Sequence, residues 1–323
     1  MIKHAIWGIG IGMTMAMTFV TEKAHAIIVF NDALNLKAPG VTSMLNFAAV
    51  SARKASNQQI YRRNVQGSLG AVWVSLGAPA GGAKSGPSST TLNQGTDVYA
   101  VLGNDNNVWV KVGSVGGWAN FGAPPPGAGS APAVGAFGPQ PFGSLYVAVL
   151  GNDNVPYTRK RDPNGGAFSA WIKVGSNSVF AAPGISISAT NTNANIYSVG
   201  VFEETLNNRC VFMACYTNWF GYGAGLSRWG ASGTNWTTST GFARVAVAVV
   251  GTDNRVWTTV SVTDGQNFPN FSQIPGGPVA DSAPGTGWFP NTDRLITAVS
   301  DASGNKWVYN APVADQWTNI GQP

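Results

Sequence analysis

The chain has 323 residues, of which only 10% are charged, and its formal net charge is +5. The positive residues are scattered along the chain, so the charge pattern argues against a nucleic-acid-binding surface. The 41 glycines, 19 prolines and 11% aromatic residues, without a long helix-period run, exclude a helical bundle and predict many short β-strands.

The N-terminal segment predicts export. An almost unbroken apolar run over residues 5–20 follows Lys3, and Ala24-His25-Ala26 has the small-x-small pattern that signal peptidase recognises. We therefore expect a signal peptide over residues 1–26 and a secreted mature chain, extracellular or periplasmic. An uncleaved anchor is the alternative, but the run is short for a membrane span, and no later segment is long and apolar enough to be one.

Cleavage after Ala26 would remove both histidines of the chain, His4 and His25. A mature chain without histidine has no histidine general base, no histidine-containing triad and no histidine metal ligand. We therefore expect no metal site and no cofactor.

The two cysteines, Cys210 and Cys215, lie in one apolar run. In a continuous strand their offset places them on opposite faces and roughly 16 Å apart, too far for a disulfide. Two free thiols are therefore favoured, while a bulge would allow a bridge in an oxidising compartment.

A turn between two strands recurs along the chain. Gly-x-Asp-x-x-Val-Trp stands at residues 103–109 and 251–257, a variant stands at 151–157, and a related turn stands at 300–307. Each copy follows a run of small and β-branched residues and precedes an aromatic residue, a pattern typical of a β-hairpin. The turn aspartates Asp105, Asp153 and Asp253 are expected to bond to the local backbone.

A second element recurs downstream of each turn: an aromatic residue, two variable residues, an apolar residue and usually glycine. Its aromatic residues, spaced 45 to 53 residues apart, are Trp73, Trp118, Trp171, Trp219, Phe271 and Trp317. A third element, Ala or Ser followed by Pro and a small residue, comes next, and an extra copy stands at residues 38–41. An N-terminal strand that completes the last repeat would remove the free edges of a ring.

These repeats predict an all-β fold, a six-bladed β-propeller of four-stranded repeats of about 50 residues, closed by an N-terminal strand. The single domain covers residues 27–323. The predicted blades cover residues 45–94, 95–139, 140–190, 191–242, 243–290 and 291–323, the last completed by 27–44. The fourth blade is the most divergent, because Glu203-Glu204 stands where the Gly-x-Asp turn is expected.

The order of turn, aromatic strand and Ala-Pro in blades 2 and 5 resembles the PLL-like (Photorhabdus-lectin-like) family of bacterial propeller lectins over most of residues 45–323. The resemblance implies sugar binding in shallow pockets between neighbouring blades, as in the six-bladed fucose lectins. Those fucose lectins rely on an Arg, a Glu and a Trp in each site. The mature chain has only two glutamates, Glu203 and Glu204, so that site cannot recur here.

The favoured function is carbohydrate binding, because an aromatic ring stacks on the C–H face of a sugar while polar side chains bind its hydroxyls. We expect sites beside blades 2, 3 and 5, which keep the turn. Trp118 and Trp171 would be the stacking platforms, with Asn104 and Asn152 as their polar partners. The alternative for both tryptophans is packing between blades.

Three further tryptophans, Trp229, Trp236 and Trp288, have no matching aromatic residue in most repeats and are also candidate ligand-binding residues. Trp288 lies in a Gly- and Pro-rich connection, where a loop would expose it. Packing is again the alternative.

The expected partners are glycans or glycoconjugates, not nucleic acid, and the sequence leaves open a homo-oligomer and the identity of the sugar. The alternative function is a non-catalytic protein-interaction or envelope and adhesion propeller. A glycoside hydrolase is less well supported, since adjacent Glu203 and Glu204 would point to opposite faces of a strand. We therefore do not expect an enzyme.

Overall fold

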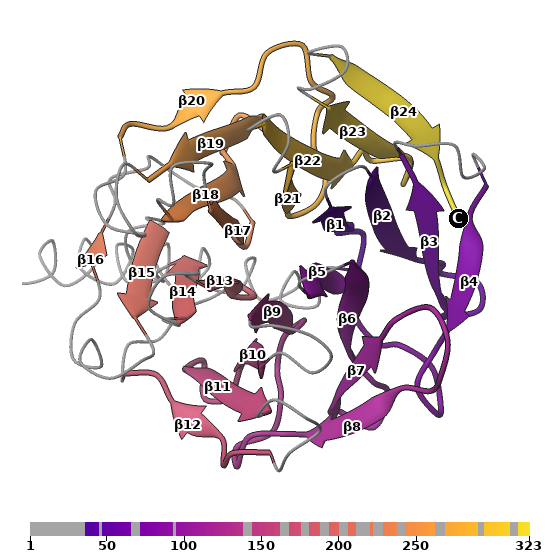
Figure 1. The fold of residues 1–323 in the computed structure, drawn as a ribbon, viewed down its shortest axis with the longest axis vertical. Coiled ribbons are helices and arrows are strands. Elements are labelled where there is room, and N and C mark those ends of the chain that lie inside the picture. Colours follow the sequence, from indigo (N-terminus) through magenta and orange to yellow (C-terminus); the bar gives the residue numbers. More distant parts are fainter. Residues whose placement is uncertain are drawn as a thin grey trace, which may run out of the picture.

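The structure, a computed structural model, describes residues 36–44, 47–65, 72–92, 95–137, 144–161, 168–175, 181–187, 194–199, 206–210, 220–221, 229–237, 243–261, 269–289, 294–310 and 316–323. These ranges contain 24 β-strands and no helix, so none holds a helix that would cross a membrane. The strands form six four-stranded sheets around a common centre (Figure 1). The predicted all-β propeller is confirmed.

Each sheet is one blade and takes four consecutive strands. Blade 1 contains β1 (Gly40–Met44), β2 (Phe47–Arg53), β3 (Ile60–Asn64) and β4 (Val74–Gly77), and blade 2 contains β5 (Ser88–Leu92), β6 (Thr96–Leu102), β7 (Val108–Val112) and β8 (Ala119–Gly122). Blade 3 contains β9 (Ala133–Phe137), β10 (Ser144–Leu150), β11 (Pro156–Arg161) and β12 (Ile172–Lys173), and blade 4 contains β13 (Gly184–Ile187), β14 (Ala194–Val199), β15 (Leu206–Cys210) and β16 (Phe220–Gly221). Blade 5 contains β17 (Ser232–Thr237), β18 (Ala243–Val250), β19 (Val256–Val260) and β20 (Ser272–Gln273), and blade 6 contains β21 (Gly285–Phe289), β22 (Arg294–Ser300), β23 (Lys306–Asn310) and β24 (Trp317–Gly321).

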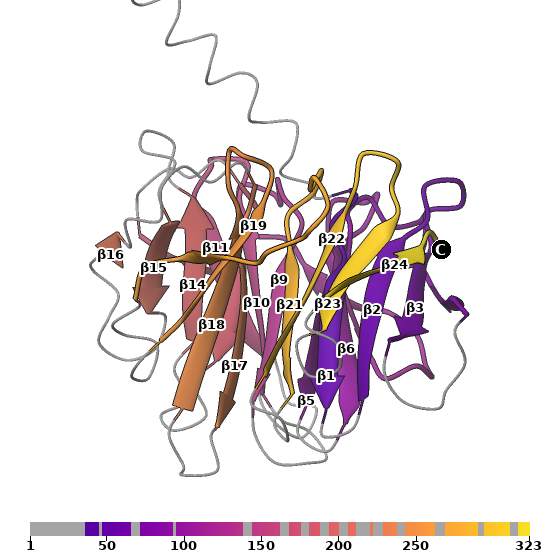
Figure 2. The same ribbon diagram turned by 90° about the horizontal axis from the view of Figure 1, so that it is seen from above.

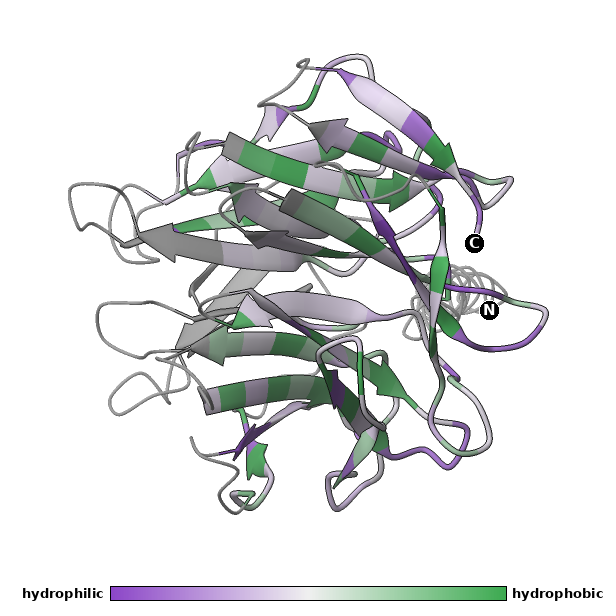
Figure 3. Ribbon diagram, turned by 45° about the vertical axis from the view of Figure 1, so that its right-hand side comes forward, coloured by the Kyte–Doolittle hydropathy of each residue, from purple (hydrophilic) through white to green (hydrophobic). Residues whose placement is uncertain are grey.

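Chain order is also spatial order within a blade. The first strand of each blade lies nearest the centre and the fourth lies at the rim (Figure 1), and the strands run between the two faces of the disc (Figure 2). The second strands are buried almost throughout, as in Val98–Leu102 of β6 and Leu145–Leu150 of β10. In β6, for example, Val98 and Leu102 pack toward blade 3 and Val101 packs toward blade 1, so apolar residues occupy both faces of the strand. Figure 3 shows hydrophobic residues along the strands.

The closing strand is not where the sequence predicted it. β1 pairs with β2 over Gly40↔Ser51 to Met44↔Phe47, so it is the innermost strand of blade 1. Blade 6 takes all four of its strands from residues 285–321. The Ala-Pro element therefore begins a blade and does not end one, and each predicted blade is shifted by one strand. A local hairpin orders far less chain than a pairing between the two ends of the domain, which favours the observed arrangement.

Side chains, and not a shared strand, close the seam between blades 6 and 1. Ser43 Oγ donates to the carbonyl of Trp288 (2.6 Å) and accepts from the Trp288 amide (2.7 Å). A Cβ at Gly287 would lie only 2.7 Å from Cγ1 of Val41, so glycine is needed for β1 and β21 to approach. At the rim, Arg63 Nη1 donates to the carbonyl of Ile320 (2.6 Å).

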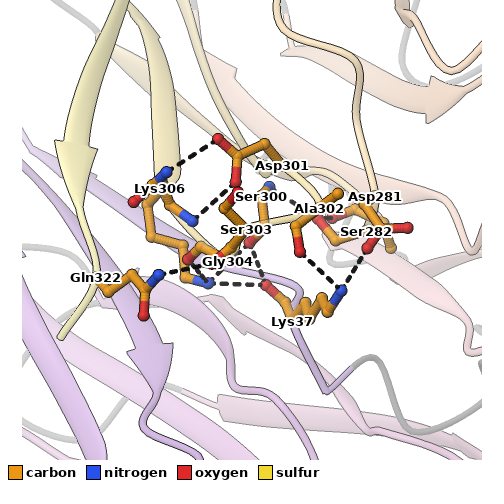
Figure 4. Close-up of polar contacts among 12 residues, drawn as sticks. Lys37, Asp281, Ser282, Ser300, Asp301, Ala302, Ser303, Gly304, Lys306 and Gln322 are labelled. Atoms are coloured by element: carbon orange, nitrogen blue, oxygen red, sulfur yellow. Dashed lines mark hydrogen bonds and ion pairs between the residues drawn. The ribbon is translucent and has the colours of Figure 1, made fainter.

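A buried lysine adds to this seam. Lys306 is the first residue of β23 and is only 4% exposed. The first residue of the equivalent strands β7 and β19 is a valine, Val108 and Val256. Its Nζ donates to Ser300 Oγ (2.8 Å), to the Gly304 carbonyl (3.1 Å) and to the Lys37 carbonyl (3.3 Å), as Figure 4 shows. Burial lowers the pKa of Lys306 to about 8, although Asp301 opposes this effect and the Lys37 charge adds to it.

The innermost strands meet at a small central pocket of about 50 Å³. Residues from all six blades line it, and most are Pro, Gly, Ala or Ser, for example Pro39-Gly40 of blade 1 and Pro284-Gly285 of blade 6. Small side chains are required here because six strands converge on one axis.

Candidate functional site

In blades 1, 2, 3 and 6, a tryptophan lies in the seam to the preceding blade, at the start of the outermost strand. Trp118 packs on buried residues of blades 1 and 2, and Trp171 packs on buried residues of blades 2 and 3. Trp73 occupies the seam between blades 6 and 1, and Trp317 the seam between blades 5 and 6. All four rings are half-buried. They contribute to packing and still keep part of the ring at the surface, so both readings of Trp118 and Trp171 stay open.

The indole N–H groups separate these tryptophans into two kinds. The Nε1 atoms of Trp73, Trp118 and Trp171 are buried and have no hydrogen-bond acceptor, whereas Trp317 Nε1 donates to the Pro275 carbonyl (3.2 Å). A buried donor without an acceptor costs about 1–3 kcal/mol. A water molecule or a ligand oxygen that satisfied these donors would recover that free energy.

A cationic residue recurs at one position of the third strand, and in blade 3 it contacts the seam tryptophan. It is the fourth residue of the third strand. Arg63, Lys111, Arg159 and Arg209 hold this position in blades 1 to 4, whereas Thr259 and Tyr309 hold it in blades 5 and 6. The sequence analysis missed these residues. Alignment of the six third strands would have found them, because a cationic residue holds the position in blades 1 to 4.

Arg159 shows the geometry most fully. Its Nε donates to the Ser169 carbonyl (2.8 Å), and its Nη1 donates to the Phe121 carbonyl of blade 2. Its guanidinium carbon lies 4.9 Å from the centre of the Phe168 ring and 5.9 Å from the Trp171 ring, both within cation–π range. Burial lowers the pKa of Arg159, but an arginine stays protonated in proteins. A cation therefore lies between two aromatic rings in this seam.

The predicted polar partners lie elsewhere. Asn104 Nδ2 donates to Gln58 Oε1 (2.6 Å) and to the Gly81 carbonyl (2.5 Å), and Asn152 Nδ2 donates to the Pro126 carbonyl (2.9 Å). Both amides thus tie their turn to the loop of the preceding blade. In blade 2 the turn leads into the start of β7, where Val108 pairs with Gly122. Trp118 precedes Ala119, which pairs with Val110, further along β7 from the turn. The structure does not bring the asparagines and the tryptophans together.

The structure also places the three tryptophans that lie outside the expected pattern. Trp288 does not lie in an exposed loop: it belongs to β21, is 7% exposed and packs with Ala246 of blade 5, so this prediction was wrong. In blade 5, Trp236 of β17 pairs with Arg244 of β18. Phe289 of β21 pairs with Arg294 of β22 at the equivalent position of blade 6. Trp229 is half-buried and packs on residues of blades 5 and 6.

The turn aspartates do bond locally, as predicted. Asp105 accepts from the Asn107 amide (3.0 Å) and from Trp109 Nε1 (3.0 Å), and Asp153 accepts from the Tyr157 hydroxyl (2.9 Å). Residue four of each turn has a positive φ, 60° in Asn106 and 59° in Asn154, which favours asparagine or glycine there. Partial burial raises the pKa values of Asp105 and Asp153, and hydrogen bonds lower them by more, so the net shift is downward.

A larger pocket of about 360 Å³ opens on the turn face between blades 5 and 6. Its polar lining includes Asn254, Asp281, Asp301 and Ser303. Lys37 forms an ion pair with Asp281, and Asp301 accepts from Trp307 Nε1 (2.9 Å). This pocket presents carboxylates, in contrast to the seams that hold Arg63 and Arg159.

Three groups of predictions lie outside the described residues. They concern the signal peptide over residues 1–26, the pair Glu203-Glu204, and the side chains of Cys210, Cys215, Trp219 and Trp236. Within the described ranges, no group of three His, Cys, Asp or Glu residues is placed to hold a metal ion.

No protein-family model matches the chain, and no curated protein matches it. Solved structures do resemble it. An Aleuria aurantia lectin, described as a six-bladed β-propeller with a novel mode of fucose recognition, has a TM-score of 0.60 at 12% identity over 88% of this chain and 96% of that chain. The protein AofleA from Arthrobotrys oligospora has a TM-score of 0.59 at 14% identity over 90% of this chain and 88% of its own. The SapL1 lectin in complex with α-methyl fucoside has a TM-score of 0.59 at 12% identity over 91% of this chain and 98% of its own.

These likenesses define the class of the protein, which is a β-propeller. At this level of identity they show the fold and nothing finer.

Proposed function

We propose that the protein is an exported, non-catalytic, carbohydrate-binding propeller of the PLL-like kind, with its six sheets closed into a six-bladed ring. The observation that carries the proposal is the half-buried tryptophan in the seams of blades 1, 2, 3 and 6. Similar folds in the fucose-binding lectins support it. The central pocket, which all six blades line, supports the ring count.

The seam tryptophan suits a shallow sugar site. A partly exposed indole offers its face or edge to the C–H groups of a pyranose, and such contacts contribute about 1 kcal/mol each beyond the area that they bury. A single site of this kind binds weakly, because a monosaccharide covers little surface. Several sites on one rigid ring would bind a glycan-coated surface through avidity. The repeat architecture therefore fits a lectin better than a pocket for one small molecule.

The carboxylates of the described residues favour binding over hydrolysis. Hydrolysis of a glycosidic bond requires two carboxyl groups that flank the bond. Asp105, Asp153 and Asp301 are instead held by hydrogen bonds within their own turns, and Asp281 is paired with Lys37. We infer from this that the protein binds glycans without cleaving them.

A glycan array on the purified mature chain tests the proposal. The expected result is reproducible binding to a defined subset of glycans, reduced in Trp171→Ala. A blank array at high protein density would contradict it, and time-dependent cleavage of a bound glycan would contradict the non-catalytic part.

A protein-interaction propeller is the second candidate, and exposed apolar residues near the seams favour it. Val115 is 86% exposed, Val72 67% and Val74 58%. Exposed apolar side chains are a feature of docking surfaces. A blank array, together with capture of a defined exported partner that is lost in the double variant Val74→Ser/Val115→Ser, would favour this reading.

A further inference from the structure

We infer that the two seams in which the structure describes an arginine side chain at this position, between blades 6 and 1 and between blades 2 and 3, bind sugar residues that carry a carboxylate or a sulfate group. The inference rests on the proposed carbohydrate-binding function and names the ligand class of these two sites. It concerns Arg63 with Trp73 in the first seam and Arg159 with Trp171 in the second.

The two seams are built alike. Arg63 Nη1 donates to the carbonyl of Ile320 in blade 6, and Arg159 Nη1 donates to the carbonyl of Phe121 in blade 2, the equivalent residue one blade before. Each arginine is half-buried. In each of the two blades, the seam tryptophan immediately precedes the outermost strand. In blade 1, Val74 of the outermost strand pairs with Arg62. In blade 3, Ile172 pairs with Thr158 at the equivalent position, and both Val74 and Ile172 are exposed. The rim of blade 3 and the end of β8 lie side by side in Figure 1.

The arginine and tryptophan side chains of these two seams donate hydrogen bonds and cannot accept them. Among the described residues, Arg159 contacts two backbone carbonyls and two aromatic rings, and Arg63 contacts one backbone carbonyl; neither has a carboxylate partner. The indole N–H groups of Trp73 and Trp171 are further donors without acceptors. A sugar hydroxyl both donates and accepts, so a neutral sugar would leave its own donors unmet by these side chains. A carboxylate or sulfate only accepts, and it matches the fork of a guanidinium.

The charge balance points the same way. A partly buried cation without a counter-ion is costly, and neutral carbonyls compensate it only in part. An anionic ligand would supply the missing charge at both arginines. The seam between blades 1 and 2 differs, because its carboxylate Asp97 already pairs with Arg62 (2.8 Å) and its cation Lys111 is only 3% exposed.

The remaining described seams provide an internal comparison. Thr259 and Phe271 hold the corresponding positions in blade 5, and Tyr309 and Trp317 hold them in blade 6, so neither seam has a cation there. Acidic sugars are therefore expected at two seams and not at every seam.

The test compares two polymers on one backbone: polygalacturonate and its carboxyl-reduced, neutral form. Binding of the mature chain is measured by surface plasmon resonance for the wild type, Arg159→Gln, Arg159→Lys and Arg255→Gln. Arg255 is the matched control, because it is also a half-buried arginine with Nη1 on a backbone carbonyl, that of Gly277, but it lies on the turn face. Melting temperatures of all four proteins show that they are folded.

We expect the wild type to bind the acidic polymer and not the reduced one, with an affinity that falls as salt is added. Arg159→Gln should weaken binding about tenfold, since a charge-assisted contact is lost, Arg159→Lys should weaken it less, and Arg255→Gln should leave it unchanged. Equal binding to both polymers, or equal loss in Arg159→Gln and Arg255→Gln, would overturn the inference and leave the proposed function standing. Failure to bind these polymers together with a blank glycan array would instead overturn the proposed function.

Discussion

Trp171 and Trp257 are both half-buried, but they lie at different ends of their blades. Trp171 lies in a seam beside Arg159, whereas Trp257 lies next to its turn and donates to Asp253 (3.2 Å). Both Trp→Ala substitutions should lower the free energy of unfolding by about 2–4 kcal/mol, somewhat less than for a fully buried ring. Only Trp171→Ala should lower glycan binding per folded molecule.

Thermal unfolding and binding to a multivalent glycan surface, measured on the same two preparations, check this prediction. If both variants bind as the wild type does, Trp171 is a packing residue only. If both lose binding in proportion to their stability, the seam has no direct contact with the ligand.

At the residue scale, the sequence identified the aromatic half of the candidate site and missed the cationic half. The tryptophans recur, so comparison of the repeats finds them. The cationic position of the third strand holds Arg63, Lys111, Arg159 and Arg209 but then Thr259 and Tyr309, so it becomes visible only when the third strands are aligned with one another. The asparagines were misplaced for a different reason: Asn104 and Asn152 reach back to the preceding blade, and a single repeat contains no sign of that contact.

At the element scale, the Gly-x-Asp turns should contribute stability that depends on pH. Hydrogen bonds hold the pKa values of Asp105, Asp153 and Asp301 below their usual value in the folded state, despite the opposing effect of burial. Their contribution is therefore complete above about pH 4 and is lost as the pH falls through the lower folded values. The triple variant Asp105→Asn/Asp153→Asn/Asp301→Asn should be less stable than the wild type at pH 7, and the gap should narrow toward pH 2.

Melting temperatures of both proteins between pH 7 and pH 2 measure the gap. A gap that stays constant over this range would show that the turns stabilise the fold through shape alone and not through charge.

Removal of residues 27–42 should destabilise blade 1 in particular, because β1 supplies the inner partner of β2. Hydrogen exchange is the measurement. Protection should fall in β2 and β3, while β22 and β23 of blade 6 keep most of theirs. Selective loss in blade 6 would restore the closing-strand arrangement that the sequence predicted.

The hairpins themselves could be read from the sequence, since each Gly-x-Asp turn does join the second and third strands of a blade, as in β6–β7 and β10–β11. The point in the repeat at which each blade begins could not be predicted from the sequence. A cyclic repeat looks the same wherever counting starts, so the order of elements alone does not show whether the Ala-Pro strand ends one blade or begins the next. The observed pairing of β1 with β2 decides it.

At the scale of the whole molecule, the seam between blades 6 and 1 should respond to pH through Lys306. Its folded pKa of about 8 lies below the usual value of about 10.4, so the unfolded chain keeps this proton to a higher pH than the folded chain does. Stability therefore rises as the pH increases from 8 toward 10. Relative to Lys306→Met, which has no titrating group, the wild type should gain about 2–3 kcal/mol over this window.

Chemical denaturation at several pH values checks this expectation, and the difference between the two proteins cancels the titration of tyrosines common to both. Lys84→Met, a lysine on the surface that donates to Asn106, is the control and should follow the wild type. A constant difference between wild type and Lys306→Met from pH 7 to 10.5 would contradict the buried ammonium.

The sequential blades also bear on how such a molecule changes in length over evolution. Since every sheet is one contiguous stretch of chain, tandem duplication or loss of a repeat leaves all remaining sheets whole, which a strand shared across the seam would prevent. The packing of the inner strands around the central axis limits the number of repeats. The small residues around the central pocket fit the convergence of six inner strands, and a different number would change the angle between neighbours and demand larger or smaller side chains there. Selection on repeat number therefore acts first on the Pro, Gly, Ala and Ser positions of the inner strands, and the rim seams are left free to diverge in what they recognise.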